Sequence, residues 1–328
     1  MASTEEIGLA RWRELAKYSP VRSFFQSPEA HTFFASCGEM QSEAYGVEEE
    51  GRLAGVMVVT LYQEGGFLRK RLTSRAVVNG GPLLANDISD EALQMLLTTV
   101  IENLRRRCIY IETRNFNDYS RWRAVFEKCG FSYQQHYNFH IDTADGNVDG
   151  RMDKSRRKKI RRATENGAIV EHDNSAVAPF HSILSTLYRT KIHKPLLPLT
   201  FFEALMQQPF AHLFIVKEPQ GTVIGGQLCV ELSGDILYSW FCCGMDSEYR
   251  DLHPSIMANY AAIRYAADHG FRRLDMMGAG SPGDGGYGVR DFKAQFGGTL
   301  VEHGRYLYIC NHVVYTLGKL YIHLKSKR

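Results

Sequence analysis

The chain has 328 residues, a formal net charge of +3, and 44% hydrophobic and 23% charged residues, which describes an ordinary globular protein. This length suits two domains, and the small net charge does not by itself indicate a nucleic-acid partner. The first twenty residues carry charges such as Glu5 and Arg11 and lack the apolar core of a secretory signal. No run approaches the roughly 18 apolar residues of a membrane span. We therefore expect a cytoplasmic protein.

The cysteines and histidines do not show the sequence spacing of metal ligands. The seven cysteines are scattered without a C-x-x-C pair, and neighbours such as Cys242 and Cys243 would point to opposite faces of a strand. The histidines do not form H-E-x-x-H, so we predict reduced packing cysteines and no metal site. The chain also lacks the G-x-S-x-G elbow and the G-x-x-x-x-G-K-[ST] phosphate loop, which argues against a hydrolase or a nucleoside triphosphatase.

The first half of the chain predicts a mixed α/β unit. Apolar spacing indicates helices, alternation of β-branched residues indicates strands, and Ser27 before Pro28 is typical of a helix start. In chain order we expect a helix over 7–19, a helix from Pro28, a hairpin of 45–49 with 53–62, a strand over 75–79, a helix over 90–107, a strand over 108–112, a helix over 120–129 and a final strand over 131–141.

A polar linker, 145–150, leads into a cluster of cations over 154–162. Ser155 is the predicted cap of a helix that ends near Asn166-Gly167. This helix is either a solvated connection or a phosphate-contacting surface, because a diphosphate, a lipid head group or an RNA backbone would each be attracted to it.

The second half repeats the order of elements. Helices are expected over 176–192 and, capped by Thr200, over 201–208; strands over 212–217, 223–232 and 235–243; then a helix over 254–269 and a strand over 272–277. We interpret this as a degenerate duplication, with two unrelated α/β domains as the alternative. The predicted fold class is α/β (α+β), with two domains that each contain a mixed, mostly antiparallel sheet flanked by helices.

The stretch 278–303 is the most informative part of the chain. A glycine-rich loop precedes a short helix over 289–296, in which Phe292 and Phe296 share one face, and Gly297-Gly298 ends that helix. The glycines at 278, 280 and 283 formally match a dinucleotide fingerprint, and Glu302 lies near the expected acidic position. Pro282 and further glycines separate the loop from the helix, which argues against that interpretation.

Residues 287–298, YGVRDFKAQFGG, resemble the G-x-x-x-F-K-x-x-F-G-G signature of the FemAB-like (FemABX) transferases. These are double acyltransferase folds of the GNAT type, and their best-known members attach amino acids from aminoacyl-tRNA to peptidoglycan precursors. The resemblance implies two tandem GNAT-like domains over 1–148 and 149–310, with the basic helix 153–166 beginning the second. The tail 311–328 is expected to pack back on the first domain, with a membrane-surface helix as the alternative.

The resemblance also implies roles for individual residues. Lys293 would place a fixed positive charge beside the donor's phosphates and the developing oxyanion. Asp275 and Asp291 are candidate general bases. Residues expected to wall the channel or contact the donor and the acceptor's phosphates are Phe292, Tyr287, Arg290, Gly286, Gly288, Arg250, Arg189, Lys191, Arg157, Lys158 and Arg161.

GNAT enzymes that use acetyl-CoA hold its pyrophosphate on a [QR]-x-x-G-x-[GA] loop at a helix N-terminus. This chain has Arg250 to Ser255 there, with both glycines replaced and Pro254 lacking an N–H. We therefore expect a FemAB-like N-acyltransferase with no cofactor, whose donor is aminoacyl-tRNA or an acyl-CoA. It would act by direct attack, without a covalent enzyme intermediate, because no nucleophile–base pair is evident.

The expected acceptor is an amine of a cell-envelope or peptidoglycan precursor, as a small or lipid-linked molecule that carries phosphate, with at most peripheral membrane contact. One alternative is a CoA-dependent N-acetyl or N-acyltransferase that acts on a sugar amine or an amino acid. Another is a nucleic-acid-binding module that uses the basic helix.

Overall fold

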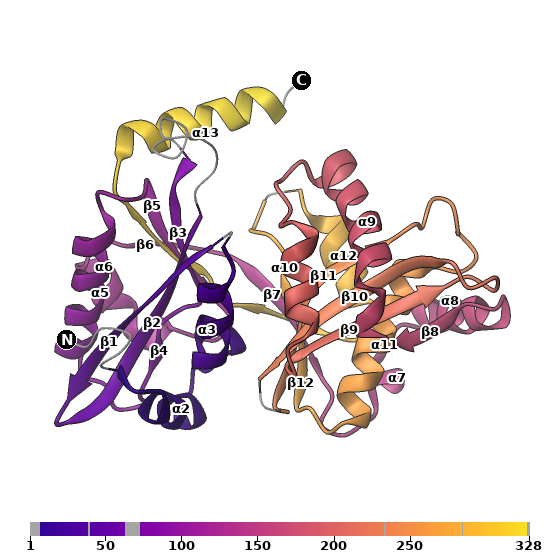
Figure 1. Cartoon of the computed structure of the whole chain (residues 1–328), viewed down its shortest axis with the longest axis horizontal. Helices are drawn as coiled ribbons and strands as arrows, with labels where there is room; N and C mark the ends of the chain where they lie inside the picture. Colours follow the sequence, from indigo (N-terminus) through magenta and orange to yellow (C-terminus); the bar gives the residue numbers. More distant parts are fainter. Residues whose placement is uncertain (1–6, 39, 63–72, 233, 284, 327–328) are drawn as a thin grey trace. The chain divides into compact units, whose positions relative to one another are not determined.

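The computed structural model describes residues 7–38, 40–62, 73–232, 234–283 and 285–326. It divides into two compact units, which we call unit 1 (Met1–His136 with Glu302–Arg328) and unit 2 (Tyr137–Val301). The order of elements can be followed in Figure 1. Among the described helices, none combines the length and the apolar character that crossing a bilayer requires.

Unit 1 is built on a mixed sheet with strand order β1-β2-β3-β5-β14-β6, and β4 pairs with β2. The pair β3–β5 is parallel, whereas β1–β2, β2–β3, β5–β14 and β14–β6 are antiparallel. The strands are β1 (Gln41–Glu49), β2 (Arg52–Tyr62), β3 (Arg75–Gly80), β4 (Leu83–Leu84), β5 (Tyr110–Asn115), β6 (Ser132–Gln134) and β14 (Arg305–Ile309).

The helices of unit 1 form where the sequence places apolar residues at helical spacing. In α5, the side chains of Leu93, Leu96, Leu97 and Val100 are buried in the main core, and Ser89 caps the helix by accepting from Ala92 N. The helical segments are α2 (Leu9–Tyr18), η1 (Phe24–Gln26), α3 (Pro28–Ser36), α5 (Asp90–Leu104), η2 (Ser120–Trp122), α6 (Arg123–Lys128) and α13 (His312–Ser326).

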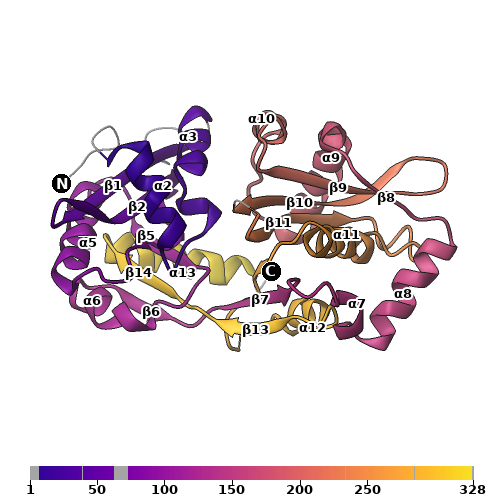
Figure 2. The same ribbon diagram turned by 90° about the horizontal axis from the view of Figure 1, so that it is seen from below.

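Unit 2 contains a second mixed sheet, with strand order β13-β7-β12-β11-β10-β9-β8. The strands are β7 (Tyr137–Asp142), β8 (Ile169–His172), β9 (Ala211–Lys217), β10 (Val223–Leu232), β11 (Ile236–Gly244), β12 (Arg273–Gly278) and β13 (Thr299–Glu302). Figure 2 shows α9 and α10 on one face of this sheet and α11 on the other. The helical segments are α7 (Val148–Arg151), α8 (Lys154–Glu165), η3 (Asn174–Ala176), α9 (Val177–Leu187), the π-helical turn η4 (Tyr188–Ile192), α10 (Leu199–Met206), α11 (Pro254–Asp268) and α12 (Tyr287–Ala294).

The two sheets share one topology. The order β9-β10-β11-β12-β7-β13 repeats β1-β2-β3-β5-β14-β6, and the central pairs β11–β12 and β3–β5 are both parallel. This agreement confirms the predicted duplication, and it excludes the alternative of two unrelated domains. The mostly antiparallel pairings also exclude a dinucleotide-binding half domain, which requires a parallel sheet.

The predicted domain boundaries at 148 and 310 differ from the boundaries in the structure. The expected strand over 131–141 is two strands, because β6 joins the sheet of unit 1 and β7 joins that of unit 2. In the same way, β13 pairs in unit 2 and β14 in unit 1. The chain turns between β13 and β14 at Gly304, where φ is +64° and a Cβ would lie 2.2 Å from the Tyr133 ring.

Two predicted helix caps are also wrong. Helix α8 begins at Lys154 with Asp153 at the N-cap position, so Ser155 lies within the helix rather than before it. Helix α10 begins at Leu199 after Pro198, so Thr200 is likewise inside its helix. Each predicted cap lies one or two residues inside its helix, which is within the usual uncertainty of a helix end.

Candidate active site

Lys293 lies on α12 and its ammonium group binds the end of β12. Its Nζ donates to the carbonyl oxygens of Met276 at 2.6 Å and of Gly278 at 2.8 Å, and a longer contact of 3.4 Å reaches Met277 O. Helix α12 ends at Ala294, two residues before the predicted end, and turn residues follow as far as Gly297. At Gly297 φ is +80° and a Cβ would lie 2.6 Å from Arg151 O, so this position in the turn after the helix requires glycine.

The environment of Lys293 changes its acidity. Burial lowers the pKa of Lys293 to about 8, against the opposing influence of the nearby Asp275 carboxylate. The group is still mostly protonated at neutral pH. It is therefore a poorly hydrated positive charge held by backbone dipoles, which is the kind of charge that can stabilise a developing anion.

Met277 adopts a strained conformation between two charged groups. Its φ of +58° lies in the left-handed region, which a side chain of this size seldom enters. Asp275 Oδ1 accepts from Met277 N at 2.7 Å, while Lys293 contacts the carbonyls on either side. The carboxylate and the ammonium thus fix the same three-residue turn.

Asp275 belongs to a polar row across three strands. It pairs in register with Tyr238 on β11 and with His140 on β7, and it is fully buried. Asp275 Oδ2 lies 3.2 Å from His140 Nε2, and the His140 side chain is 13% exposed. Burial, with a contribution from Asp275, raises the pKa of Tyr238 above its ordinary value. Asp275 cannot touch a substrate directly, so any proton that it helps to move passes through His140.

Arg156 attaches α12 to the basic helix α8, and the sequence analysis missed it. Its guanidinium lies 4.6 Å from the Phe292 ring centre and 4.3 Å from that of Phe296, and Nη2 donates to Phe292 O at 3.0 Å. Burial lowers the pKa of Arg156 to about 10. A signal was available, because Arg156 lines up with the buried Ile160 and Ala163 at spacings of four and three.

The glycine-rich loop is held by its neighbours. Arg290 is buried and donates to Ser281 O at 2.9 Å, and Tyr137 exchanges two backbone hydrogen bonds with Ala279 and Gly280. Arg290 therefore holds the loop rather than facing a ligand. Gly286 precedes α12 and Gly288 lies in its first turn, where a Cβ would meet nothing within 4 Å. The side chain of Tyr287 lies outside the described residues.

The remaining predicted residues lie farther out in unit 2. Arg157 is half-buried and donates to Asp149 O at 3.0 Å, and Arg161 contacts Glu165 at 3.6 Å. The predicted residues that are exposed are Lys158 on α8, Arg189 and Lys191 on η4, Arg250 before α11, and Asp291 on α12. Among the predicted residues, Lys293 and Asp275 hydrogen-bond to the end of β12, and Phe292 lies beside Arg156 on the helix that carries Lys293.

The N-terminus of α11 is the place where an acetyl-CoA enzyme would hold pyrophosphate. Here Asp246 occupies it: Oδ1 accepts from Ser255 N at 3.1 Å and Oδ2 accepts from Ser255 Oγ at 2.5 Å. A Cβ on Gly244 would lie 2.6 Å from Ser255 N, so the first turn of α11 packs directly on the end of β11. The chain's own carboxylate therefore satisfies the helix N-terminus.

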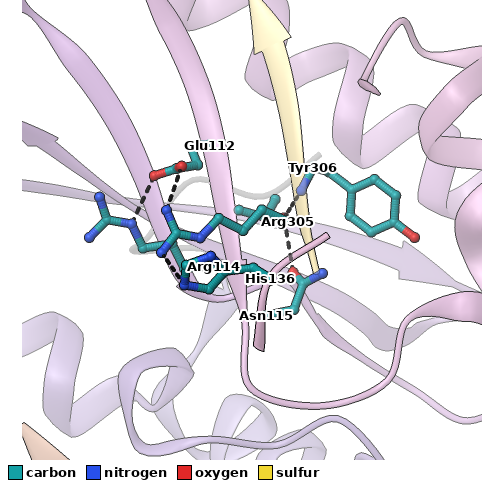
Figure 3. Close-up of polar contacts among 7 residues, drawn as sticks. Glu112, Arg114, Asn115, His136, Arg305 and Tyr306 are labelled. Atoms are coloured by element: carbon teal, nitrogen blue, oxygen red, sulfur yellow. Dashed lines mark hydrogen bonds and ion pairs between the residues drawn. The ribbon is translucent and has the colours of Figure 1, made fainter. Parts of the chain in front are cut away.

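Unit 1 contains a second polar centre (Figure 3). Glu112 on β5 accepts from Arg114 at 2.8 Å and from Arg305 on β14 at 2.9 Å, and Arg305 also contacts His136 at 2.9 Å. Burial pulls the pKa of Glu112 upward, but the two guanidinium groups outweigh it and the pKa is lowered. Two cations share one carboxylate here, and the Arg114 side chain is 38% exposed. The sequence analysis did not identify this centre.

Comparisons with known proteins agree with this fold. Residues 150–293 match the sequence model of the "Acetyltransferase (GNAT) domain" family, which covers most of unit 2. A crystal structure of FemX superposes with a TM-score of 0.72 at 17% identity, covering 97% of this chain and 99% of that chain. No protein of curated function matches the sequence.

Two further solved structures are similar. A tandem GNAT protein from the clavulanic acid biosynthesis pathway has a TM-score of 0.62 at 10% identity, with 95% of this chain and 97% of that chain covered. The C-terminal domain of a putative lysylphosphatidylglycerol synthetase from Agrobacterium fabrum has a TM-score of 0.60 at 11% identity, with 95% and 94% covered.

The chain therefore has a double-GNAT fold, and the family match of its residues 150–293 supports an acyltransferase. The resemblance to the FemAB-like transferases is confirmed at the level of the fold, which FemX shares over nearly the full length of both chains. Within the described part of the chain, no three His, Cys, Asp or Glu side chains converge as metal ligands would.

We expect Lys293 to titrate far below other lysines. In a lysine-labelled NMR titration, one side-chain resonance should move with a midpoint near pH 8 and be missing in Lys293→Met. Because this pKa lies below the ordinary 10.5, the unfolded chain binds more protons between these values, so stability should rise with pH there. The Met variant should lose that rise. If every lysine titrates above pH 10, the described environment is wrong.

Proposed function

We propose that this protein is an N-acyltransferase of the FemAB-like type. It would transfer an aminoacyl group from an activated donor such as aminoacyl-tRNA to an amine of a cell-envelope or peptidoglycan precursor. The double-GNAT fold and the F-K helix with its buried Lys293 support this assignment.

The observation that carries the choice of donor is the Asp246 carboxylate at the N-terminus of α11. A CoA pyrophosphate would have to displace this internal anion from Ser255 N and would meet like charge there. Pro254 removes a further N–H from the same turn. An aminoacyl ester on tRNA has no CoA pyrophosphate that would have to bind at this helix N-terminus.

The chemistry is direct attack of the acceptor amine on the ester carbonyl. The new C–N bond forms as the carbonyl oxygen becomes an oxyanion; the C–O bond then breaks, and the ribose hydroxyl leaves with a proton. Lys293 would stabilise the oxyanion. Its 3.4 Å contact to Met277 O is the weakest of its three, so it is the one that an incoming oxygen would replace.

The amine must lose a proton during attack, and we assign its removal to His140. Fully buried Asp275 would act as the positioning residue that orients the imidazole, at 3.2 Å from its Nε2. In this pair the imidazole of His140 would take the proton, and the buried carboxylate of Asp275 would fix the orientation of the imidazole.

In unit 1, we assign an anion-binding role to Arg114 and Arg305. One carboxylate, Glu112, neutralises only one of the two cations. The exposed side of Arg114 can therefore take a phosphate oxygen of a ligand without leaving a buried charge unpaired.

A CoA-dependent enzyme that modifies a sugar amine or an amino acid remains the second candidate, because the matched family is described as an acetyltransferase domain. A nucleic-acid-binding module is the third, favoured by the exposed cations of α8 such as Lys158 and Lys159. That module would bind duplexes with a steep salt dependence and without turnover.

A thermal-shift comparison separates the donors. A non-hydrolysable aminoacyl-minihelix should raise the melting temperature at concentrations where the uncharged minihelix gives a smaller shift and acetyl-CoA gives none, since only a ligand of the folded state stabilises it. Stabilisation by acetyl-CoA alone would overturn the tRNA donor and favour the CoA enzyme. Equal shifts with charged and uncharged RNA would favour the nucleic-acid-binding module.

The proton-transfer role predicts a loss confined to the chemical step. His140→Gln should lower kcat by about 100-fold with little change in KM, because the group that takes the proton from the amine is lost. The exposed His312, changed to Gln, is the control and should behave as wild type. An unchanged kcat in a folded His140→Gln protein would contradict the assignment.

The anion-binding role of Arg114 predicts a loss of affinity for phosphate groups. Arg114→Gln should weaken the binding of inorganic pyrophosphate by about tenfold or more in a calorimetric titration, because a binding contact to phosphate is lost. Arg123→Gln, which removes an exposed cation paired with Glu127 on α6, is the matched control. Equal affinities for both variants would show that Arg114 does not bind the anion.

A further inference from the structure

The C-terminal helix α13 is attached to unit 1 through its beginning. Cys310 N and Asn311 N donate to Ile109 O, and Asn311 Oδ1 accepts from Val314 N at 3.1 Å as a cap. In the first turns of the helix, the Tyr315 ring meets Tyr110 edge-on at 5.6 Å. The half-buried Val314 and Tyr315 therefore mark the side of α13 that faces unit 1.

A different side of α13 presents large apolar residues to solvent. Val313 is 70% exposed, Leu317 is 61% exposed and Leu320 is 54% exposed. Their spacings of four and three place them on one face of the helix. Among the other large apolar residues that are exposed in the described chain, such as Met95 on α5, no three lie on one helix. A continuous apolar stripe of this kind indicates a surface that something covers.

Charge identifies the kind of partner. After Glu302 the sequence contains no acidic residue, and its charged residues are Arg305, Lys319, Lys325, Lys327 and Arg328. A second copy of this helix would bring like charges together, which disfavours self-association. The partner should therefore offer apolar groups to the stripe and negative charge to the cations of this segment. The head-group region of an anionic bilayer offers both.

The length of α13 fits the same partner. Fifteen residues give a helix of about 22 Å at 1.5 Å per residue, which is shorter than the roughly 30 Å hydrocarbon core. Such a helix can lie in the interface but cannot cross it. We propose that α13 is an interfacial helix that docks this protein on anionic phospholipid surfaces, with Val313, Leu317 and Leu320 inserted and the positive charge of the segment attracting the anionic lipids.

Vesicle flotation with the full chain tests this proposal. The wild type should float with phosphatidylglycerol/phosphatidylcholine vesicles at low salt, and should bind at least tenfold less to pure phosphatidylcholine or at high salt. Leu317→Asp combined with Leu320→Asp should weaken binding at least tenfold. Met95→Asp, at a similarly exposed apolar position on α5, should bind as wild type.

A second variant covers the case in which the leucine changes disturb folding. Lys319→Glu with Lys325→Glu keeps the apolar stripe, and it should also lose binding to anionic vesicles. Wild-type protein that stays unbound with anionic vesicles at low salt would overturn the proposal. The proposal would also be overturned if light scattering showed a wild-type dimer that the double leucine variant converts to a monomer, because a second copy would then cover the stripe. This test requires no enzymatic activity, so it is independent of the proposed function.

Discussion

The contact on which the rest of the site depends is the Lys293 ammonium group on the carbonyl oxygens that end β12. Burying a lysine is unfavourable, and the pKa of about 8 measures part of that cost. The contact holds Met277 in a left-handed conformation that it would not adopt alone, with Asp275 fixing the other side of the turn. Strain and a desolvated charge at one place are typical of sites that are organised for chemistry rather than for stability.

The fold supplies the positions of these groups. Strands β11 and β12 pair through Tyr238 and Asp275, where β12 also meets His140 on β7. The polar row therefore lies at the centre of the unit 2 sheet. Strand β7 lies in the first half of the chain but joins the sheet of unit 2. Strand β14 lies in the second half but joins the sheet of unit 1. Neither half of the sequence alone carries a complete sheet.

Much of this could be predicted from local signals. The apolar spacing of α5 and the contact between Phe292 and Phe296 are properties of neighbouring residues, and each was predicted. The split of 131–141 into β6 and β7 could not be predicted, because apolar and polar residues alternate in both strands, and this alternation does not reveal which sheet each strand joins.

The missed residues share a physical reason. Arg305 contacts Glu112 across 193 positions of sequence, and Asp246 binds Ser255, nine residues later, in the first turn of α11. Such pairs are formed by tertiary structure and leave no periodic pattern. Arg156 looked like one cation of a solvated cluster, although its spacing to Ile160 and Ala163 marked the buried face. Counting charges along a helix is less informative than assigning each to a face.

The most direct test is the pH dependence of single-turnover aminoacyl transfer by the wild type and by Lys293→Arg. If protonated Lys293 stabilises the transition state, the wild-type rate should fall as pH rises through about 8, and the fall should move to higher pH in the arginine variant because guanidinium stays charged. A wild-type rate that keeps rising past this value, or the same falling limb in both proteins, would contradict the central claim.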